Sequence, residues 1–318
     1  MVRVGITGCD NLRAAELVRI LINHPDVELM WVESTGCAGM RLDEVVPGIV
    51  EESELTLSRK GELDEVDLVF TCGPSEQLAA TLNWLRLPDE TRVIDLSGCH
   101  NQDCHEDGVW QYGLSEMQRR ILVHDTQRAT VPGNAAMISL LAVMPLARNL
   151  LLSRPLAFSV NMGKLAFPDN VRTIDGYDPD GWADVQRQEV GMALKQCQPT
   201  FDKPVTLTIS PHPDGRTIAV ETQFECDLDG QQIRQLYGQY YEDHNLVFIV
   251  DRPVATVDVE NTSKCLIYLN KDEHTGVLTI QAMMDLLVKG SAGTAVHVMN
   301  LMFGLHERVG LALKGSGC

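Results

Sequence analysis

A glycine turn between a strand and a helix at the N-terminus is the feature that most constrains this fold. Val2–Thr7 is rich in valine and isoleucine and predicts a strand, and Gly8–Asn11 predicts a turn. Apolar residues at helical spacing predict a helix over Ala14–Asn23, which ends before Pro25 because proline cannot continue it. With a strand expected over Val27–Val32, this segment is a βαβ unit, and such a unit requires a parallel sheet.

The alternation of strands and helices continues beyond this unit. Buried strands are expected over Val66–Cys72 and Arg92–Leu96, with a helix over Ser75–Leu85 between them. Parallel strands joined by helices are typical of a doubly wound nucleotide-binding domain. We therefore predict a Rossmann-type α/β domain at the start of the chain, up to Pro132, after which the composition changes.

The sequence after Pro132 favours a second α/β domain of a different kind. We expect a long, nearly apolar helix over Asn134–Leu152, an amphipathic helix over Asp229–Tyr241 and a C-terminal helix over Ser291–Val309. The strand-like segments are Val205–Ser210, Thr217–Glu225, Val247–Val250 and Leu278–Met283. Strands that follow one another without regular crossover helices favour a mixed or antiparallel sheet.

Length and charge narrow the classes of function. A chain of 318 residues is natural for two domains, and 44% hydrophobic residues are enough for a buried core. The formal net charge of -18 argues against nucleic acid or an anionic membrane as a partner, since both require positive patches. Nine cysteines without a signal peptide predict reduced thiols and a cytoplasmic location.

The turn after the first strand is suited to a phosphate. Backbone N–H groups and the positive end of the helix would face the ligand, and Gly8 has no Cβ to block a pyrophosphate. Gly5 is the first glycine of the pattern, and Asn11 stands where a third glycine is usual. Cys9 lies within the turn, where packing requires only a small side chain.

The end of the second strand bears on the choice of cofactor. Glu33 lies there, and a carboxylate at this position can hold a ribose hydroxyl and repel a 2′-phosphate. The hydroxyls of Ser34 and Thr35 follow directly and could bind a phosphate. The two signals conflict, so the residues leave NAD and NADP open.

Two Cys–His pairs lie close together in the first domain. Cys99-His100 and Cys104-His105 could bind zinc through thiolate and imidazole groups. The spacing is loose, and a polar surface loop or a relocated nucleophile are the other interpretations. We expect no metal site here.

Motifs along nearly the whole chain resemble one family. The matching segments, in chain order, are Gly5–Gly8, Ala15–Leu17, His24-Pro25, Ser34-Thr35, Ala38-Gly39, Asp67–Phe70 with Pro74, Val93–Ser97, Tyr112–Leu114 with Glu116, Pro132-Gly133, Pro145–Ala147, Pro211-His212 with Arg216, Leu287–Gly293, Ala295-Val296, Met299-Asn300, Glu307 and Gly310-Leu311. In this order and spacing they resemble the N-acetyl-gamma-glutamyl-phosphate reductases of arginine biosynthesis, within the aspartate-semialdehyde dehydrogenase superfamily.

The resemblance implies a fold and a reaction. NADPH would reduce an acyl phosphate to an aldehyde through a thioester on a cysteine, with a histidine as the acid or base. The C-terminal helix would return to the first domain, which gives an NAD(P)-binding domain of residues 1–133 with 291–318. Residues 134–290 would form the substrate and dimerisation domain of a homo-oligomer.

The resemblance also assigns candidate ligand-binding residues. Arg216 is the candidate partner of a small anionic metabolite, with a surface ion pair as the alternative. NADP is the cofactor implied, and Glu33 leaves NAD possible. The candidates for cofactor binding are Gly5, Gly8, Cys9, Asn11, Ser34, Thr35, Pro74, Gly290 and Gly293.

The residues that carry the family chemistry differ in this chain. Asn134 follows the Pro-Gly pair where the family has its cysteine, and Gln186 stands at the position of the family histidine. An amide nitrogen is not nucleophilic, and glutamine cannot move a proton near neutral pH. The family's glycine-rich loop is replaced by Met162–Leu165. The scaffold motifs are therefore kept while the chemical ones are lost.

These departures predict a catalytically inactive or altered relative that binds a nicotinamide dinucleotide. An active semialdehyde dehydrogenase is one alternative. An oxidoreductase that transfers hydride without a covalent intermediate is the other, and it would need a proton donor that the sequence does not identify.

Overall fold

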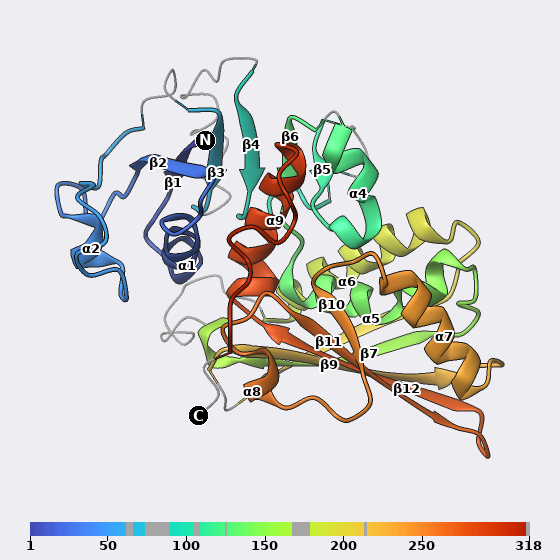
Figure 1. Ribbon diagram of the computed structural model, residues 1–318. Helices are drawn as coiled ribbons and strands as arrows, with labels where there is room; N and C mark the ends of the chain where they lie inside the picture. The colour runs from blue at the N-terminus through green and yellow to red at the C-terminus, as the bar shows by residue number, and fades with distance from the viewer. Residues whose placement is uncertain are drawn as a thin grey trace. The chain divides into compact units, whose positions relative to one another are not determined.

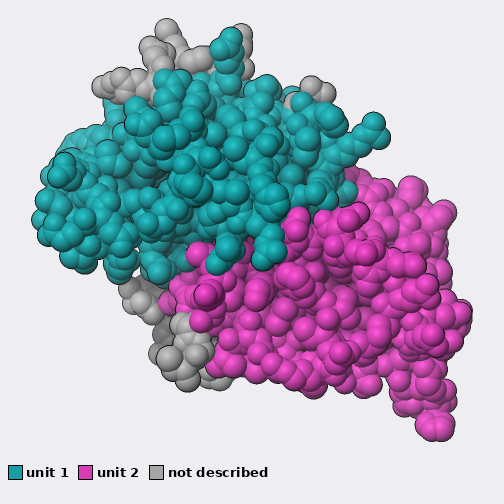
Figure 2. Space-filling view, viewed as in Figure 1, with its two compact units in different colours: residues 1–132, 291–312 teal, residues 133–290, 313–318 magenta. Residues whose placement is uncertain are grey.

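The computed structural model describes residues 1–61, 66–73, 90–102, 104, 109–124, 126–166, 179–212 and 215–315. The chain divides into two compact units, Met1–Pro132 with Ser291–Ala312 and Gly133–Gly290 with Leu313–Cys318 (Figure 2). We call them unit 1 and unit 2. The expected domains differ from these units by one residue at Gly133 and by the end of the chain after Ala312.

Unit 1 contains a six-stranded parallel sheet. The strands are β1 (Val2–Thr7), β2 (Val27–Val32), β3 (Leu68–Thr71), β4 (Arg92–Asp95), β5 (Gln111–Tyr112) and β6 (Arg128–Thr130). Their spatial order is β2-β1-β3-β4-β6-β5, and every pairing is parallel (Figure 1). The order reverses direction on either side of β1, and ligands of doubly wound sheets bind beyond the carboxyl ends of strands at such a point.

Helices accompany this sheet. They are α1 (Leu12–Leu21), α2 (Leu42–Val45), α4 (Ser115–His124) and α9 (Gly293–Met302). Val4 and Ile6 on β1 and Val69 and Phe70 on β3 are fully buried, as expected for central strands covered on both faces.

Unit 2 contains a mixed sheet of six strands. The strands are β7 (Leu156–Gly163), β8 (Val205–His212), β9 (Thr217–Glu225), β10 (Val247–Val250), β11 (Cys265–Asp272) and β12 (Val277–Asp285), in the order β10-β11-β12-β9-β7-β8. The helices are α5 (Asn134–Arg148), α6 (Pro179–Cys197), α7 (Gly230–Tyr241) and α8 (Thr256–Val259). The expectation of a Rossmann-type parallel sheet with a second, mixed-sheet α/β domain is confirmed.

One face of the sheet in unit 2 carries the core. Figure 1 shows α5, α6 and α7 on the same face of this sheet. Ile280 on β12 lies between Leu269 on β11 and Thr222 on β9, and all three are buried. The helix α5 is buried along almost its whole length, from Ala135 to Ala147, which explains its apolar sequence.

The helices α5 and α9 end several residues earlier than expected, and in each a residue with positive φ lies two positions after the last helical residue. The helix α5 ends at Arg148 instead of Leu152, because Leu150 adopts a φ of 59° and the Leu151 N–H donates back to the Leu146 carbonyl at 2.9 Å.

The C-terminal helix shows the same kind of ending. It begins at Gly293, after a π-helical turn over Val288–Ala292, and ends at Met302 instead of Val309. Gly304 has a φ of 68°, and the Leu305 N–H donates to the Asn300 carbonyl at 2.8 Å. The expected end was too late because the apolar periodicity of the sequence continues past Gly304, the glycine that terminates the helix.

Several elements were not expected from the sequence. They are α2, α4, α6, α8, β5, β6, β7 and β11. The helix expected over Ser75–Leu85 lies outside the described residues. Within the described part of the chain, none of the helices combines the length and apolar character that a membrane crossing requires.

Candidate functional site

The turn after β1 is held in place by its glycines. Gly8 has a φ of 69°, and a Cβ there would lie 2.5 Å from the backbone nitrogen of Gly73. Only glycine fits this backbone and this approach. Gly5 serves packing, because a Cβ there would lie 2.2 Å from the ring of Trp31.

Asn11 joins the turn to the first turn of α1. Its carboxamide oxygen accepts the Ala14 N–H at 3.0 Å and caps the helix, and its nitrogen donates to the Cys72 carbonyl at 2.9 Å. The N–H groups of Leu12 and Arg13 have no hydrogen bond within the described residues. These are the donors that a helix N-terminus offers to a phosphate.

Asp10 is a site residue that the sequence analysis did not single out. Its carboxylate accepts four hydrogen bonds from the loop after β2: the Ser34 hydroxyl at 2.5 Å, the Thr35 N–H at 3.1 Å and hydroxyl at 3.0 Å, and the Gly36 N–H at 3.3 Å. Burial alone would raise the pKa of this carboxyl, but these bonds outweigh it and hold the pKa below its usual value. Asp10 is therefore ionised at neutral pH.

Glu33 lies beside this loop, at the carboxyl end of β2. Burial, and next the charge of Asp10, raise the pKa of its carboxyl. Its Oε2 atom is buried without a hydrogen-bond partner in the described part of the structure. The Glu33 backbone accepts the Cys9 N–H at 2.8 Å, which fixes the end of β2 against the turn after β1.

Two thiols near this turn, Cys9 and Cys72, are buried. Burial, with Asp10 and Cys37 nearby, raises the pKa of the Cys9 thiol to about 12, and burial also raises the pKa of Cys72. A raised pKa disfavours the thiolate, which is the form of cysteine that acts as a nucleophile. Pro74, the remaining cofactor candidate in this region, lies outside the described residues.

In unit 2, Gln186, one of the two positions expected to carry chemistry, caps the N-terminus of α5 together with Glu189. The Gln186 carboxamide oxygen accepts the Ala136 N–H at 3.0 Å, and Glu189 Oε1 accepts the Gly133 N–H at 3.0 Å. Both side chains come from α6 and are buried. Together they satisfy N–H groups that the first turn of α5 leaves without partners.

Asn134 and Gly290 lie together next to this cap. Asn134 is the first residue of α5 and is partly exposed, and a Cβ on Gly290 would lie 3.5 Å from its carboxamide oxygen. The described thiols of unit 2 are elsewhere: Cys197 ends α6, Cys226 follows β9 and Cys265 begins β11. Gly293, also a cofactor candidate, begins α9 in unit 1.

Arg216 is held in an ion pair inside unit 2. Its Nε donates to Asp285 at 2.6 Å, and Asp285 is fully buried. The other oxygen of Asp285 accepts the N–H groups of Leu287 and Val288, which shapes the chain just before Gly290. Arg216 therefore supports this turn, and its pairing with an anionic metabolite stays a prediction.

The Cys–His segment of unit 1 is engaged in local contacts. Cys104 is buried and its thiol donates to the Asn101 carbonyl at 3.1 Å, while the His100 ring stacks on Trp110 with centroids 4.1 Å apart. His105 lies outside the described residues. Among the residues that the structure does describe, no three His, Cys, Asp or Glu side chains gather as metal ligands would.

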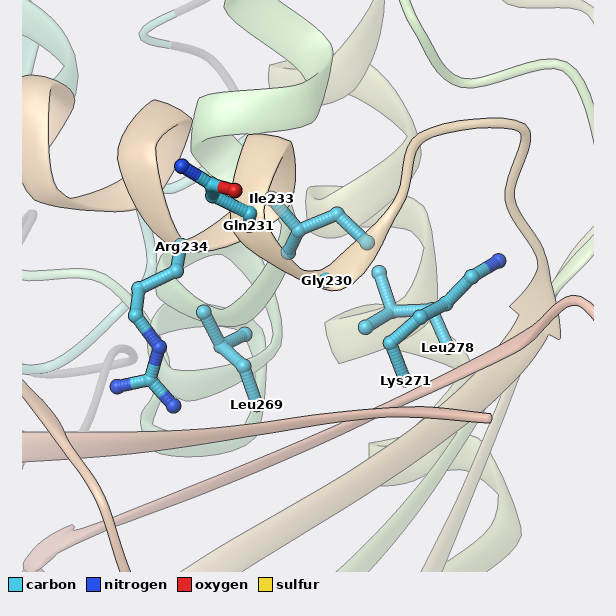
Figure 3. Close-up of a pocket in the computed structure, with 7 residues that line it drawn as sticks. All are labelled: Gly230, Gln231, Ile233, Arg234, Leu269, Lys271 and Leu278. Carbon is cyan, nitrogen blue, oxygen red and sulfur yellow. The ribbon is translucent and has the colours of Figure 1, made fainter. Parts of the chain in front are cut away.

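A separate depression of about 320 Å³ lies at the start of α7 (Figure 3). Its cations are already bonded: Arg234 pairs with Asp251, and Lys271 donates to the carbonyls of Cys226 and Gly276. None of the candidate residues lines it. The lining residues are Gly230, Gln231, Ile233, Arg234, Leu269, Lys271 and Leu278.

Known domain families match both units. Residues 3–124 match the semialdehyde dehydrogenase NAD-binding domain, and residues 186–285 match the semialdehyde dehydrogenase dimerisation domain. An N-acetyl-gamma-glutamyl-phosphate reductase of Parabacteroides distasonis is 34% identical to this chain over 99% of both sequences. This chain belongs to the N-acetyl-gamma-glutamyl-phosphate reductase family.

Solved structures of the wider superfamily have the same fold as this family member. Aspartate semialdehyde dehydrogenase II of Vibrio cholerae aligns with a TM-score of 0.74 at 14% identity, over 96% of this chain and 98% of the other. The aspartate semialdehyde dehydrogenase of Candida albicans, solved with NADP, aligns with a TM-score of 0.68 at 10% identity, over 95% and 98% of the two chains. The family resemblance read from the sequence is confirmed, and the matched domains support a nicotinamide dinucleotide cofactor and oligomer formation.

Proposed function

We propose that this chain is a nicotinamide dinucleotide-binding member of the reductase family that no longer reduces acyl phosphates through a covalent thioester. Its relatives are reductases of N-acetyl-gamma-glutamyl phosphate. That reaction requires a nucleophile which attacks the acyl carbon and a group which moves protons. The carboxamides of Asn134 and Gln186 at the corresponding positions can do neither.

The observation that supports the proposal most strongly is that the Gln186 side chain caps α5. Its oxygen already accepts a hydrogen bond from the Ala136 N–H, and it is buried beneath the start of α5. Beside it, the Glu189 carboxylate accepts the Gly133 N–H. Both side chains therefore act in stabilising a helix, where an acid/base group would have to be free to exchange protons with a substrate.

Unit 1 supports the binding part of the proposal. It matches an NAD-binding domain, and behind its glycine turn it offers the N–H groups of Leu12 and Arg13, which have no hydrogen bond in the described part of the chain. The dimerisation domain supports assembly, which we propose is a homo-oligomer. The described cysteines are free thiols, which is typical of a reducing compartment and supports a cytoplasmic location.

The test is an activity assay paired with a binding measurement. The purified full-length chain would be assayed with N-acetyl-gamma-glutamyl phosphate and NADPH or NADH, and in reverse with the semialdehyde, phosphate and NADP or NAD. We expect a rise in melting temperature with a dinucleotide and no turnover in either direction. Turnover within about tenfold of a cysteine-bearing relative, a loss of only about 1.4 kcal/mol of transition-state stabilisation, would overturn the loss of chemistry.

Restoring the missing groups makes the test sharper. Asn134→Cys alone should not produce activity, because Gln186 still cannot transfer protons. Asn134→Cys combined with Gln186→His supplies both groups, while Gln186→His alone is the matched control without a nucleophile. Activity in the Asn134→Cys single variant would show that only the thiol is missing. A thioester trapped on the unmodified chain would contradict the proposal outright.

A further inference from the structure

The turn after β1 and the loop after β2 form one continuous surface at the carboxyl edge of the sheet in unit 1. The two strands are parallel neighbours, with Ile6 opposite Val32. Backbone hydrogen bonds continue beyond the strands, from the Glu33 N–H to the Ile6 carbonyl and from the Cys9 N–H to the Glu33 carbonyl, both at 2.8 Å. A dinucleotide whose pyrophosphate lies on the first turn places its adenosine ribose at the end of β2.

The donors of the loop after β2 are already occupied by an anion of the protein itself. The Ser34 hydroxyl, both the N–H and the hydroxyl of Thr35, and the Gly36 N–H all donate to the Asp10 carboxylate. The Ser34 oxygen also accepts the Cys37 N–H at 2.9 Å, so this hydroxyl is both a donor and an acceptor within the protein. These are the groups that a 2′-phosphate would need.

Glu33 adds a second carboxylate at the same edge. Its Oε2 atom is buried and has no hydrogen-bond partner among the described residues, which suits it to accept a ribose hydroxyl. The charges of Asp10 and Glu33 already act on one another. A 2′-phosphate at this edge would therefore meet the negative charges of Asp10 and Glu33.

We propose that Asp10 is a specificity-determining residue, a resident anion that fills the 2′-phosphate position and makes this chain bind NAD in preference to NADP. The inference rests on the proposed function, since it requires unit 1 to bind a dinucleotide. This preference for NAD differs from the family resemblance, which implied NADP as the cofactor. Asp10 repels the phosphate and occupies the hydrogen-bond donors that the phosphate would need, and Glu33 accepts the ribose 2′-hydroxyl, which is free in NAD and phosphorylated in NADP.

The experiment measures equilibrium binding of NADH and NADPH to the full-length chain by nicotinamide fluorescence. The wild-type chain should bind NADH at least about tenfold more tightly, because one like-charge contact costs more than about 1.4 kcal/mol. Asp10→Ala removes the anion and frees its four donors, so the affinity for NADPH relative to NADH should rise by about tenfold. Asp10→Asn removes the charge alone and should give part of this gain.

Matched variants separate the local effect from the loss of one charge. Glu33→Gln should weaken NADH binding, because the carboxylate acceptor for the ribose is lost. Glu28→Gln, on the exposed part of the same strand, should leave both affinities unchanged. Higher salt should narrow the NADH preference of the wild-type chain, since it screens the repulsion.

The outcomes are distinct. If the folded wild-type chain binds neither nucleotide, the proposed function fails, and the inference fails with it. If the chain binds NADPH as tightly as NADH or more tightly, the inference fails and the proposed function stands. An NADH preference that Asp10→Ala and Asp10→Asn both leave unchanged would overturn the role of Asp10.

Discussion

Asp10 shows at the scale of one residue what sequence reasoning could and could not reach. The glycine turn after the first strand, Gly8 within it and the conflict between Glu33 and Ser34 were all visible from residue type and position. The hydrogen bonds from the loop to Asp10 depend on how two loops fold against each other at adjacent strand ends. An acidic residue in the turn after one strand, facing hydroxyls after its parallel neighbour, was the signal available.

Glu33 gives a prediction about pH. Burial and then the Asp10 charge raise its pKa in the folded protein, whereas the unfolded value is about 4.3. Below about pH 4.3 the carboxyl is protonated in both states and costs nothing. As the pH rises through the higher folded pKa, its ionisation lowers the free energy of unfolding. Glu33→Gln should therefore gain stability over the wild-type chain between about pH 4 and 8, by less than about 1 kcal/mol because the group is partly solvated.

Urea unfolding at several pH values measures this gain, with Glu28→Gln as the matched control on the same strand. The gain should grow with pH for Glu33→Gln and should exceed that of the control at pH 8. A gain that shrinks as the pH rises would show that the sign is wrong.

Gly8 gives a second prediction at this scale. Gly8→Ala forces a left-handed backbone onto alanine and drives its Cβ against the Gly73 backbone at 2.5 Å. Gly304 has nearly the same φ, 68°, but open space around it. We expect Gly304→Ala to cost about 1–2 kcal/mol of unfolding free energy and Gly8→Ala about 3 kcal/mol or more, with loss of dinucleotide binding. Equal losses in urea unfolding would mean that the approach of Gly73 does not matter.

At the scale of elements, the sequence predicted the strands and helices that residue type alone specifies. It missed those that depend on packing against other elements. Thr217–Glu225 and Val247–Val250 were predicted to the residue, because dense β-branched and apolar runs favour strands. The strand β7 was missed, although its buried and exposed residues alternate. Its burial results from its place between β8 and β9, which the local sequence does not reveal. The ends of α5 and α9 are set by Leu150 and Gly304, which periodicity alone does not weigh.

The cap of α5 gives the prediction at this scale. Glu189 is buried and accepts the Gly133 N–H from the neighbouring helix. Glu189→Ala leaves the partly buried Gly133 N–H without this partner and should lower the unfolding free energy by about 1–3 kcal/mol. Lys195→Ala, at an exposed position of the same helix, is the matched control and should change it by less than about 0.5 kcal/mol. Similar losses of unfolding free energy in both variants, measured by chemical denaturation, would show that Glu189 does not stabilise α5 through this hydrogen bond.

At the scale of the whole molecule, the sequence predicted two α/β domains. In the second domain, the face of the sheet opposite α5, α6 and α7 is the surface through which two copies could associate. Tyr268, Gln281 and Glu221 lie side by side on β11, β12 and β9, and each is partly exposed. The adjacent row through Ile280 is buried on the face that carries the helices. Half-buried side chains across a wide sheet, in a domain matched as a dimerisation domain, favour a second copy as the cover.

We therefore predict a homodimer that forms through this face. Light scattering during size-exclusion chromatography should give about twice the mass of one chain, as expected for the commonest closed symmetry. Tyr268→Lys places a charge at the centre of the open row and should shift the population to monomer, because an unpaired charge is costly to bury in an interface. Gln239→Lys, on the exposed surface of α7, adds the same charge away from this face and should leave the dimer intact. A dimer that survives Tyr268→Lys unchanged would show that the copies meet elsewhere.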